Sequence, residues 1–287
     1  MQIRQVASRL ADVMASAREL INWAEQELHG SCADPALDSL ILLSEVTGHS
    51  RTHVLFREQI DAEEEQVFKE YVERRRLGEP IQYITGRAYF RNLTLHVGPG
   101  VLIPRPESES LISEVKVKIE SESSPWVLDL GAGSGALALA IATECPKARV
   151  VALEKDPLAI FWLRKNIGTL DENVEVIESD VSDFDGDRKF DVVVANPPYI
   201  PLSEKLPLEV ERFEPHLALF GGEQGLEVPQ LFVAAAARAL RPGGYLALEH
   251  HERQGVQIIE LLSKYFDDVT LHYDLNQRPR WSSGVRK

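Results

Sequence analysis

Apolar side chains in the first part of the chain recur every three or four positions, which is the spacing of one face of an α-helix. This stripe consists of Ile3, Val6, Leu10, Val13, Ala17, Leu20, Ile21, Ala24 and Leu28. Gly30 follows the stripe, and glycine commonly ends a helix. The pattern therefore predicts one long amphipathic helix that begins near Ile3 and ends before Gly30.

Two further helices are predicted before residue 77. Asp34 precedes Pro35, which is the usual order of an N-cap and a first helical residue, and the apolar run that follows ends before Gly48. Asp61 opens an acidic turn followed by apolar residues that continue toward Arg76. We expect residues 1–77 to form a small helical bundle whose apolar stripes are core and whose outer face recognises a substrate.

The pattern changes after Pro80. Residues 89–97 are typical of two short strands joined by a turn near Asn92, and Gly98 and Gly100 end the second strand. We expect residues 78–105 to form a β-hairpin linker that packs over the mouth of a ligand site.

Beyond this hairpin, short apolar runs alternate with helical stretches. The runs begin at Trp126, Arg149, Val174, Phe190, Tyr245 and Val269. This alternation predicts a doubly wound, mostly parallel α/β sheet, which we assign to residues 106–287. Such sheets bind their ligands beyond the carboxyl ends of the strands.

A glycine-rich loop follows the first of these strands. It consists of Gly131, Ala132, Gly133, Ser134 and Gly135. Glycines let the backbone approach a ligand closely, and Glu154 at the end of the next strand can accept both hydroxyls of a ribose. The G-x-G-x-G spacing differs from that of pyrophosphate-binding loops, so a nucleoside without a diphosphate fits better than NAD. For the loop alone, a plain tight turn is the alternative interpretation.

A second candidate segment follows the apolar run of residues 190–195. It consists of Asn196, Pro197, Pro198 and Tyr199. An amide nitrogen is a poor nucleophile because its lone pair is delocalised, so a catalyst must orient it. The Asn196 side-chain oxygen and the Pro197 carbonyl can accept its two N–H groups, while Tyr199 offers a flat face. We expect these four residues to bind a planar amide-type substrate, with Asn196, Pro197 and Tyr199 as catalytic residues; the alternative is a proline-rich turn.

Further matches to a known family extend across most of the chain. They are Arg74-Arg75, Gly78-Glu79-Pro80, Tyr83, Gly86, Leu102 to Glu107, the glycine loop, Asn196 to Ile200, Glu214-Pro215, Ala218-Leu219, Gly221-Gly222 and Leu240 to Gly244. With these segments the chain resembles S-adenosylmethionine-dependent methyltransferases and, more closely, the release-factor glutamine methyltransferase family. The segment from Leu102 to Glu107 separates that family from DNA adenine methylases, which share N-P-P-Y.

The resemblance implies a seven-stranded sheet with a final antiparallel strand near residues 281–285. It also implies S-adenosyl-L-methionine as cofactor and, as substrate, the glutamine side-chain amide in the Gly-Gly-Gln loop of peptide chain release factors. In that fold the Asp180 carboxylate or the Val181 backbone can take the adenine amino group, and Asn196 borders the cofactor.

Three positions depart from the family pattern. Glu154 stands where an aspartate is usual, Gln224 stands where an aspartate usually precedes Gly-Leu, and His250-His251 replace a stretch richer in glycine. Two other functions also remain open: an N6-adenine methyltransferase acting on DNA or RNA, and a cofactor-binding assembly factor without catalysis.

Composition narrows the choice of partner. Acidic residues outnumber basic ones by 45 to 31, for a formal net charge of −14. Proteins that hold duplex DNA gather Lys and Arg instead, so we expect a protein partner and no stable nucleic acid binding. Cys32 and Cys145 are the two cysteines, which gives no disulfide framework and no zinc motif. With no signal peptide and no membrane-spanning stretch expected, we predict a cytoplasmic enzyme that binds no metal.

Overall fold

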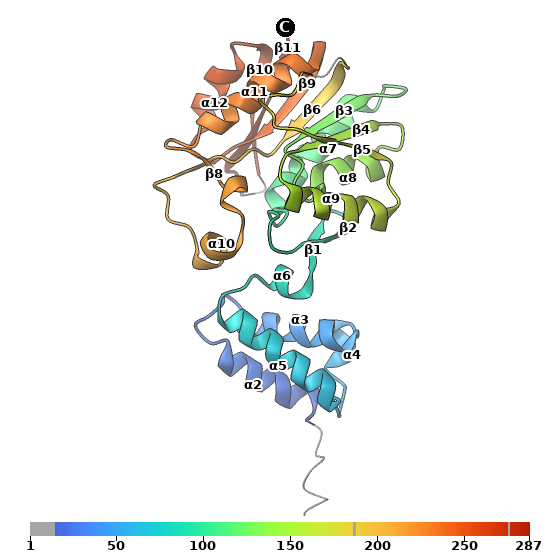
Figure 1. Ribbon diagram of the computed structural model, residues 1–287, viewed down its shortest axis with the longest axis vertical. Helices are drawn as coiled ribbons and strands as arrows, with labels where there is room; N and C mark the ends of the chain where they lie inside the picture. The colour runs from blue at the N-terminus through green and yellow to red at the C-terminus, as the bar shows by residue number, and fades with distance from the viewer. Residues whose placement is uncertain (1–14, 186–187, 275) are drawn as a thin grey trace, which may run out of the picture. The chain divides into compact units, whose positions relative to one another are not determined.

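The computed structural model describes residues 15–185, 188–274 and 276–287. They divide into two compact units, one extending through Thr85 and the other beginning at Gly86 (Figure 1). The apolar positions predicted at residues 3–13 lie outside the described residues. No helix among the described residues is long and apolar enough to cross a bilayer.

The first unit is helical. Its helices are α2 (Ala17–Glu27), α3 (Pro35–Thr47), α4 (Arg51–Val54), α5 (Ala62–Arg76) and α6 (Ile81–Thr85). The predicted starts at Asp34 and Asp61 are confirmed, since α3 and α5 begin directly after them. The helices share one core, centred on Leu42, Leu43 and Phe68.

The prediction of one uninterrupted helix from Ile3 to Leu28 is wrong at Ser16. Ser16 has extended backbone angles, and its hydroxyl accepts the Glu19 N–H at 3.3 Å. The Glu19 carboxylate accepts the Ser16 N–H at 2.8 Å in return. This reciprocal cap starts α2 at Ala17, so local hydrogen bonding overrides the continuity of the apolar stripe.

A buried ion pair joins α3 to α5. Arg75 Nε donates to Asp38 Oδ2 at 2.7 Å, and the two side chains are 8% and 12% exposed. Arg75 Nη1 also donates to the Glu79 carbonyl at 2.9 Å, which fixes the chain where it leaves α5.

The second unit is built on a seven-stranded sheet. Its strands are β3 (Trp126–Leu130), β4 (Arg149–Glu154), β5 (Val174–Glu178), β6 (Phe190–Ala195), β9 (Leu240–Glu249), β10 (Phe266–Tyr273) and β11 (Pro279–Arg286). Their order is β10-β11-β9-β6-β3-β4-β5, and β11 runs antiparallel to both neighbours. The predicted doubly wound, mostly parallel sheet and its antiparallel final strand are confirmed.

Helices cover both faces of this sheet (Figure 1). One face carries α7 (Glu109–Ile119), α8 (Ala136–Glu144) and α9 (Pro157–Leu170), and the other carries α11 (Glu227–Ala239) and α12 (Gly255–Leu262). Alternate residues of a strand serve opposite cores: Val192 and Val194 face the first, whereas Val193 and Ala195 face the second. Burial on both faces explains why β6 reads as a continuous apolar run.

The predicted hairpin is confirmed as β1 (Arg87–Phe90) and β2 (Leu93–His96). Asn166 of α9 fastens it, because its Oδ1 accepts the His96 N–H at 2.6 Å and its Nδ2 donates to the His96 carbonyl at 3.0 Å. The same Nδ2 donates to the Ser134 carbonyl at 2.9 Å. One side chain thus ties the hairpin to the glycine loop.

Several short elements were not predicted. They are α4, α6, 3₁₀ turns at Pro106–Ser108 and His216–Ala218, α10 (Leu208–Phe213), and a parallel pair formed by β7 (Ile200–Pro201) and β8 (Phe220–Gly222). The pair gathers the chain after Asn196 against a later loop, a long-range contact that local periodicity cannot show.

Replacement of Asp38 by Ala should remove the acceptor of the Arg75 Nε–H from the helical core. We expect a loss of about 3 kcal/mol in the free energy of unfolding of this unit, measured by hydrogen exchange of α3 and α5 amides. Glu73→Ala removes the exposed partner of Arg76 on the same helix and should leave exchange unchanged. Equal effects of the two variants would contradict a special role for the buried pair.

Candidate active site

One row of paired residues crosses the sheet just before a cavity. Leu153 of β4, Leu130 of β3, Ala195 of β6 and Leu248 of β9 are register partners in succession. The next residue of each strand is therefore Glu154, Gly131, Asn196 and Glu249. Parallel pairing places these residues along the same edge.

A cavity of about 300 Å³ opens at this edge. It is lined by most of the predicted site residues, namely Gly131, Ala132, Gly133, Ser134, Glu154, Asp180, Val181, Asn196 and Pro198. Three predicted residues, Gly135, Pro197 and Tyr199, do not line it. The structure thus brings the glycine loop and the start of the N-P-P-Y segment to one cavity.

Gly135 supports the loop from outside the cavity. Its φ of 85° is left-handed, and a Cβ there would lie 2.6 Å from Leu163 Cδ1. Any larger residue would meet both backbone strain and a clash at the start of α8. Gly135 therefore allows the close packing of loop and helix.

Glu154 is buried and fixes the glycine loop. Its Oε2 accepts the Gly133 N–H at 2.8 Å, and its Oε1 accepts the N–H groups of Lys155 and Asp156 at 2.8 and 2.9 Å. A carboxylate has about four lone-pair sites. Three are used here, so Oε2 retains capacity for a ligand hydroxyl.

Asp180 is already engaged. Its carboxylate accepts the Ser182 N–H at 2.8 Å and the Lys155 ammonium at 2.9 Å. These donors, with the backbone N–H of Ser182 as the strongest, lower the pKa of Asp180 to about 2. Val181 is buried beside it and forms an apolar wall of the same cavity.

Sequence reasoning missed Asp129, which also lines the cavity. Its Oδ2 accepts the Ala138 N–H at 3.0 Å, whereas Oδ1 is buried without a hydrogen-bond partner among the described residues. Burial raises the pKa of Asp129 to about 7. The feature of the sequence that could have identified Asp129 is its charge within the otherwise apolar strand β3. A buried acid with an unpartnered oxygen suits a cationic ligand group.

Asn196 belongs to a chain of hydrogen bonds that sequence reasoning also missed. Its Nδ2 donates to Ser108 Oγ at 3.4 Å, and the Ser108 hydroxyl donates to Glu249 Oε2. The Tyr199 hydroxyl donates to Glu249 Oε1 at 3.1 Å. Glu249 is 2% exposed, and burial raises its pKa to about 7. Tyr199 thus has its hydroxyl directed to Glu249.

Arg105 lines the cavity and connects two of the matched segments. Its Nη2 donates to Glu214 Oε1 at 2.5 Å, while Glu214 Oε2 accepts the Ile103 N–H at 3.1 Å. Glu214 is buried, so this contact fixes the segment around Ile103 against the loop that contains Pro215.

The histidines give no general base at the cavity. No histidine is among its lining residues. His250 is fully buried between the His251 carbonyl and the Ser282 hydroxyl, and burial lowers its pKa to about 4. Among the described residues, no group of three or more His, Cys, Asp or Glu could hold a metal ion.

Solved structures share this fold. A 16S rRNA N2 G1207 methyltransferase from T. thermophilus, in complex with AdoMet and guanosine, is 26% identical with a TM-score of 0.53, over 70% of this chain and 50% of that one. A methyltransferase from Pyrococcus furiosus gives a TM-score of 0.51 at 21% identity, over 68% of this chain and 89% of that one. The buried carboxylates of Asp129 and Glu154 line the cavity, and their negative charge suits a cationic ligand. The fold and cavity define an S-adenosylmethionine-dependent methyltransferase.

Family models and relatives narrow the class. The PrmC N-terminal domain matches residues 19–86, and the methyltransferase small domain matches residues 106–210. The release factor glutamine methyltransferase of Mycolicibacterium smegmatis is 41% identical, over 88% of this chain and 92% of that protein. That of Streptomyces coelicolor is 42% identical, over 78% of this chain and 82% of that protein. The chain belongs to the release factor glutamine methyltransferase family.

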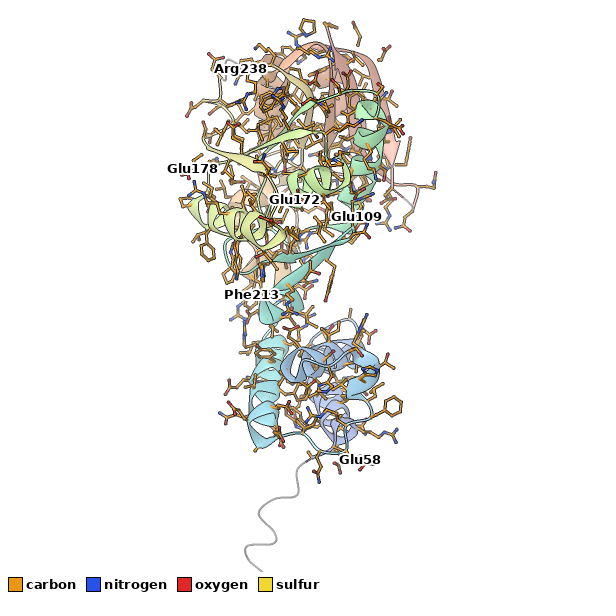
Figure 2. All side chains as sticks on the ribbon, turned by 90° about the vertical axis from the view of Figure 1, so that its right-hand side faces the viewer. Glu58, Glu109, Glu172, Glu178, Phe213 and Arg238 are labelled. Carbon is orange, nitrogen blue, oxygen red and sulfur yellow. The ribbon has the colours of Figure 1, made fainter. Side chains whose placement is uncertain are left out.

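Glu154→Ala should weaken binding of S-adenosylmethionine by about 1.5–3 kcal/mol, the scale of hydrogen bonds to a charged acceptor. Its register partner Glu178 provides a matched control, because it ends the neighbouring strand but lies at the surface (Figure 2). There Glu178 pairs with Arg164. Calorimetry should show an unchanged dissociation constant for Glu178→Ala. The same result for Glu154→Ala would remove Glu154 from the site.

Proposed function

We propose that this protein transfers a methyl group from S-adenosylmethionine to the side-chain amide nitrogen of the glutamine in the Gly-Gly-Gln loop of peptide chain release factors. The observation that carries the proposal is the position of Asn196. Asn196 lines the same cavity as the glycine loop and Glu154, which are the candidate cofactor residues. Membership of the release factor glutamine methyltransferase family indicates the methyl acceptor, a glutamine side chain of a release factor.

The chemistry requires orientation more than acid–base catalysis. The glutamine amide nitrogen has its lone pair delocalised, and it becomes cationic as it bonds to the methyl carbon. An acceptor on its N–H groups therefore binds the transition state more strongly than the ground state. We assign that role to the Asn196 side-chain oxygen. The Pro197 carbonyl is the second acceptor in this proposal, although Pro197 is not among the residues that line the cavity. The N-protonated product is acidic and loses its proton to water.

The cofactor supplies a methyl group bonded to a positively charged sulfur. Glu154 is proposed to accept its ribose hydroxyls, and Val181 to pack against its base. Asp129 is proposed to face a cationic group, because its buried Oδ1 needs a partner. All three residues line the cavity, which supports this assignment.

We propose that the helical unit recognises the release factor. It has its own core, separate from the two cores of the sheet unit, so it can act as a distinct binding module. The net charge of −14 argues against a nucleic acid substrate. Because release factors act in translation, we propose the cytoplasm as the place of the reaction.

Asn196→Ala should lower single-turnover methyl transfer by roughly 100-fold or more, as loss of an oxyanion-hole donor does. Affinity for S-adenosylmethionine should stay within a few-fold. Mass spectrometry of a release factor after incubation with enzyme and cofactor measures the transfer. Methyl transfer by Asn196→Ala at the wild-type rate would exclude a catalytic role for Asn196. Methylation of DNA or RNA instead of the factor would favour the N6-adenine alternative.

A truncated chain that begins at Gly86 tests the helical unit. It retains the hairpin, the sheet and the whole cavity lining, so it should bind S-adenosylmethionine as the full chain does. We expect it to methylate a short Gly-Gly-Gln peptide at the full-length rate but an intact release factor far more slowly, because remote contacts position the loop. Equal activity of both enzymes on the intact factor would exclude this role.

A further inference from the structure

The carboxamide of Asn196 has two ends of similar shape and opposite chemistry. Its oxygen accepts hydrogen bonds and its nitrogen donates them. An amide N–H of a substrate can therefore bind only if Oδ1 is available at the cavity. In the structure Nδ2 donates to Ser108 Oγ, so it is Oδ1 that remains for a ligand. Rotation by half a turn about the Cβ–Cγ bond of Asn196 would turn Nδ2 toward the substrate, so that two N–H donors would face each other.

Ser108 alone cannot select this orientation, because a hydroxyl both donates and accepts. Glu249 removes the ambiguity. Its Oε2 takes the Ser108 hydroxyl hydrogen, which leaves lone pairs of Ser108 Oγ for Asn196. The Tyr199 hydroxyl occupies the other carboxylate oxygen, so both oxygens of Glu249 act as acceptors.

We propose that Ser108 and Glu249 are positioning residues that hold the Asn196 carboxamide with its oxygen toward the substrate amide. This inference rests on the proposed function. Neither residue bonds to the reacting nitrogen; each acts through Asn196. All three come from separate segments, the 3₁₀ turn before α7 and the ends of β6 and β9.

The arrangement depends on the charge of Glu249. When Glu249 is protonated, its O–H donates to Ser108 Oγ, and the Ser108 hydroxyl can then donate to Asn196 Oδ1. The carboxamide turns and presents its nitrogen to the substrate. Since burial raises the pKa of Glu249 to about 7, the active orientation is lost as pH falls through about 7.

Other charged groups near Glu249 set the position of this transition. The Glu107 carboxylate raises the pKa of Glu249, whereas Arg280 and the hydroxyls of Ser108 and Tyr199 lower it. His250, the next residue, has a pKa near 4 and stays neutral over this range. Asp129 also has a pKa near 7, but it belongs to the cofactor side of the cavity, so saturating cofactor separates the two.

The first experiment measures single-turnover transfer to a release factor at saturating cofactor, from pH 5.5 to 9. The wild-type rate should fall below about pH 7. Ser108→Ala and Glu249→Gln should each lower the rate at pH 8 roughly 5- to 20-fold, the scale on which one hydrogen bond decides between two orientations. Dissociation constants for cofactor and release factor should stay within about two-fold, and the acid limb should disappear in Glu249→Gln.

Two controls separate positioning from general disruption. Ser108→Thr keeps the hydroxyl and should restore most of the rate, whereas Ser110→Ala removes a neighbouring hydroxyl bonded to Trp281 and should leave it unchanged. In the Asn196→Ala background, Glu249→Gln should have no further effect, because the residue it orients is gone. An additive loss there, or a wild-type rate in Ser108→Ala, would overturn the proposal.

A second measurement does not depend on activity. In the enzyme without substrate, the ¹³C resonance of the Glu249 carboxyl, assigned by its loss in Glu249→Gln, should titrate near pH 7. The side-chain amide resonance of Asn196 should follow the same curve. If the two resonances titrate together but the wild-type enzyme transfers no methyl group to the release factor, the proposed function is wrong and the positioning proposal stands. An Asn196 resonance that ignores the Glu249 titration would sink the positioning proposal.

Discussion

The parallel register of β3, β4, β6 and β9 is the constraint on which the site depends. Leu153, Leu130, Ala195 and Leu248 form one row, so the residues that follow them emerge together although they are far apart in the chain. Side chains of a strand alternate between faces, and a slip of one residue exchanges them. A slip of β6 by one residue would move Asn196 and would also exchange the β6 side chains that pack into the two cores. Core packing therefore protects the geometry of the site.

Two of the buried acids, Asp129 and Glu249, have similar pKa values but different environments. Asp129 uses one oxygen on the Ala138 N–H and leaves the other without a partner among the described residues. Glu249 has hydroxyl donors on both oxygens. A buried carboxylate with an oxygen that lacks a donor is stabilised by a bound cation. A buried carboxylate with donors on both oxygens instead orients the side chains that donate to it. Burial alone thus does not define the role of a carboxylate.

Much of the fold follows from sequence patterns. Runs such as residues 190–195 predict strands because burial on both faces requires continuous apolar residues. The sequence also predicted the glycine loop, Glu154 and Asn196 at the carboxyl ends of strands, and the structure confirms these positions. Ser108 and Glu249 were not identified, because Ser108 contacts Asn196 and Glu249 contacts Ser108 only across long stretches of sequence. The start of α2 was missed because the cap at Ser16 outweighs the apolar stripe.

Asn166 couples the opening of the hairpin to the opening of the glycine loop. With three hydrogen bonds, its side chain joins the backbone at His96 to the backbone at Ser134. Local opening of a protein proceeds in cooperative units rather than residue by residue. Release of the hairpin at His96 must break bonds that also hold the glycine loop, and the reverse is equally true. The two segments therefore belong to a single opening unit, so a fluctuation of the hairpin is also a fluctuation of the cofactor loop.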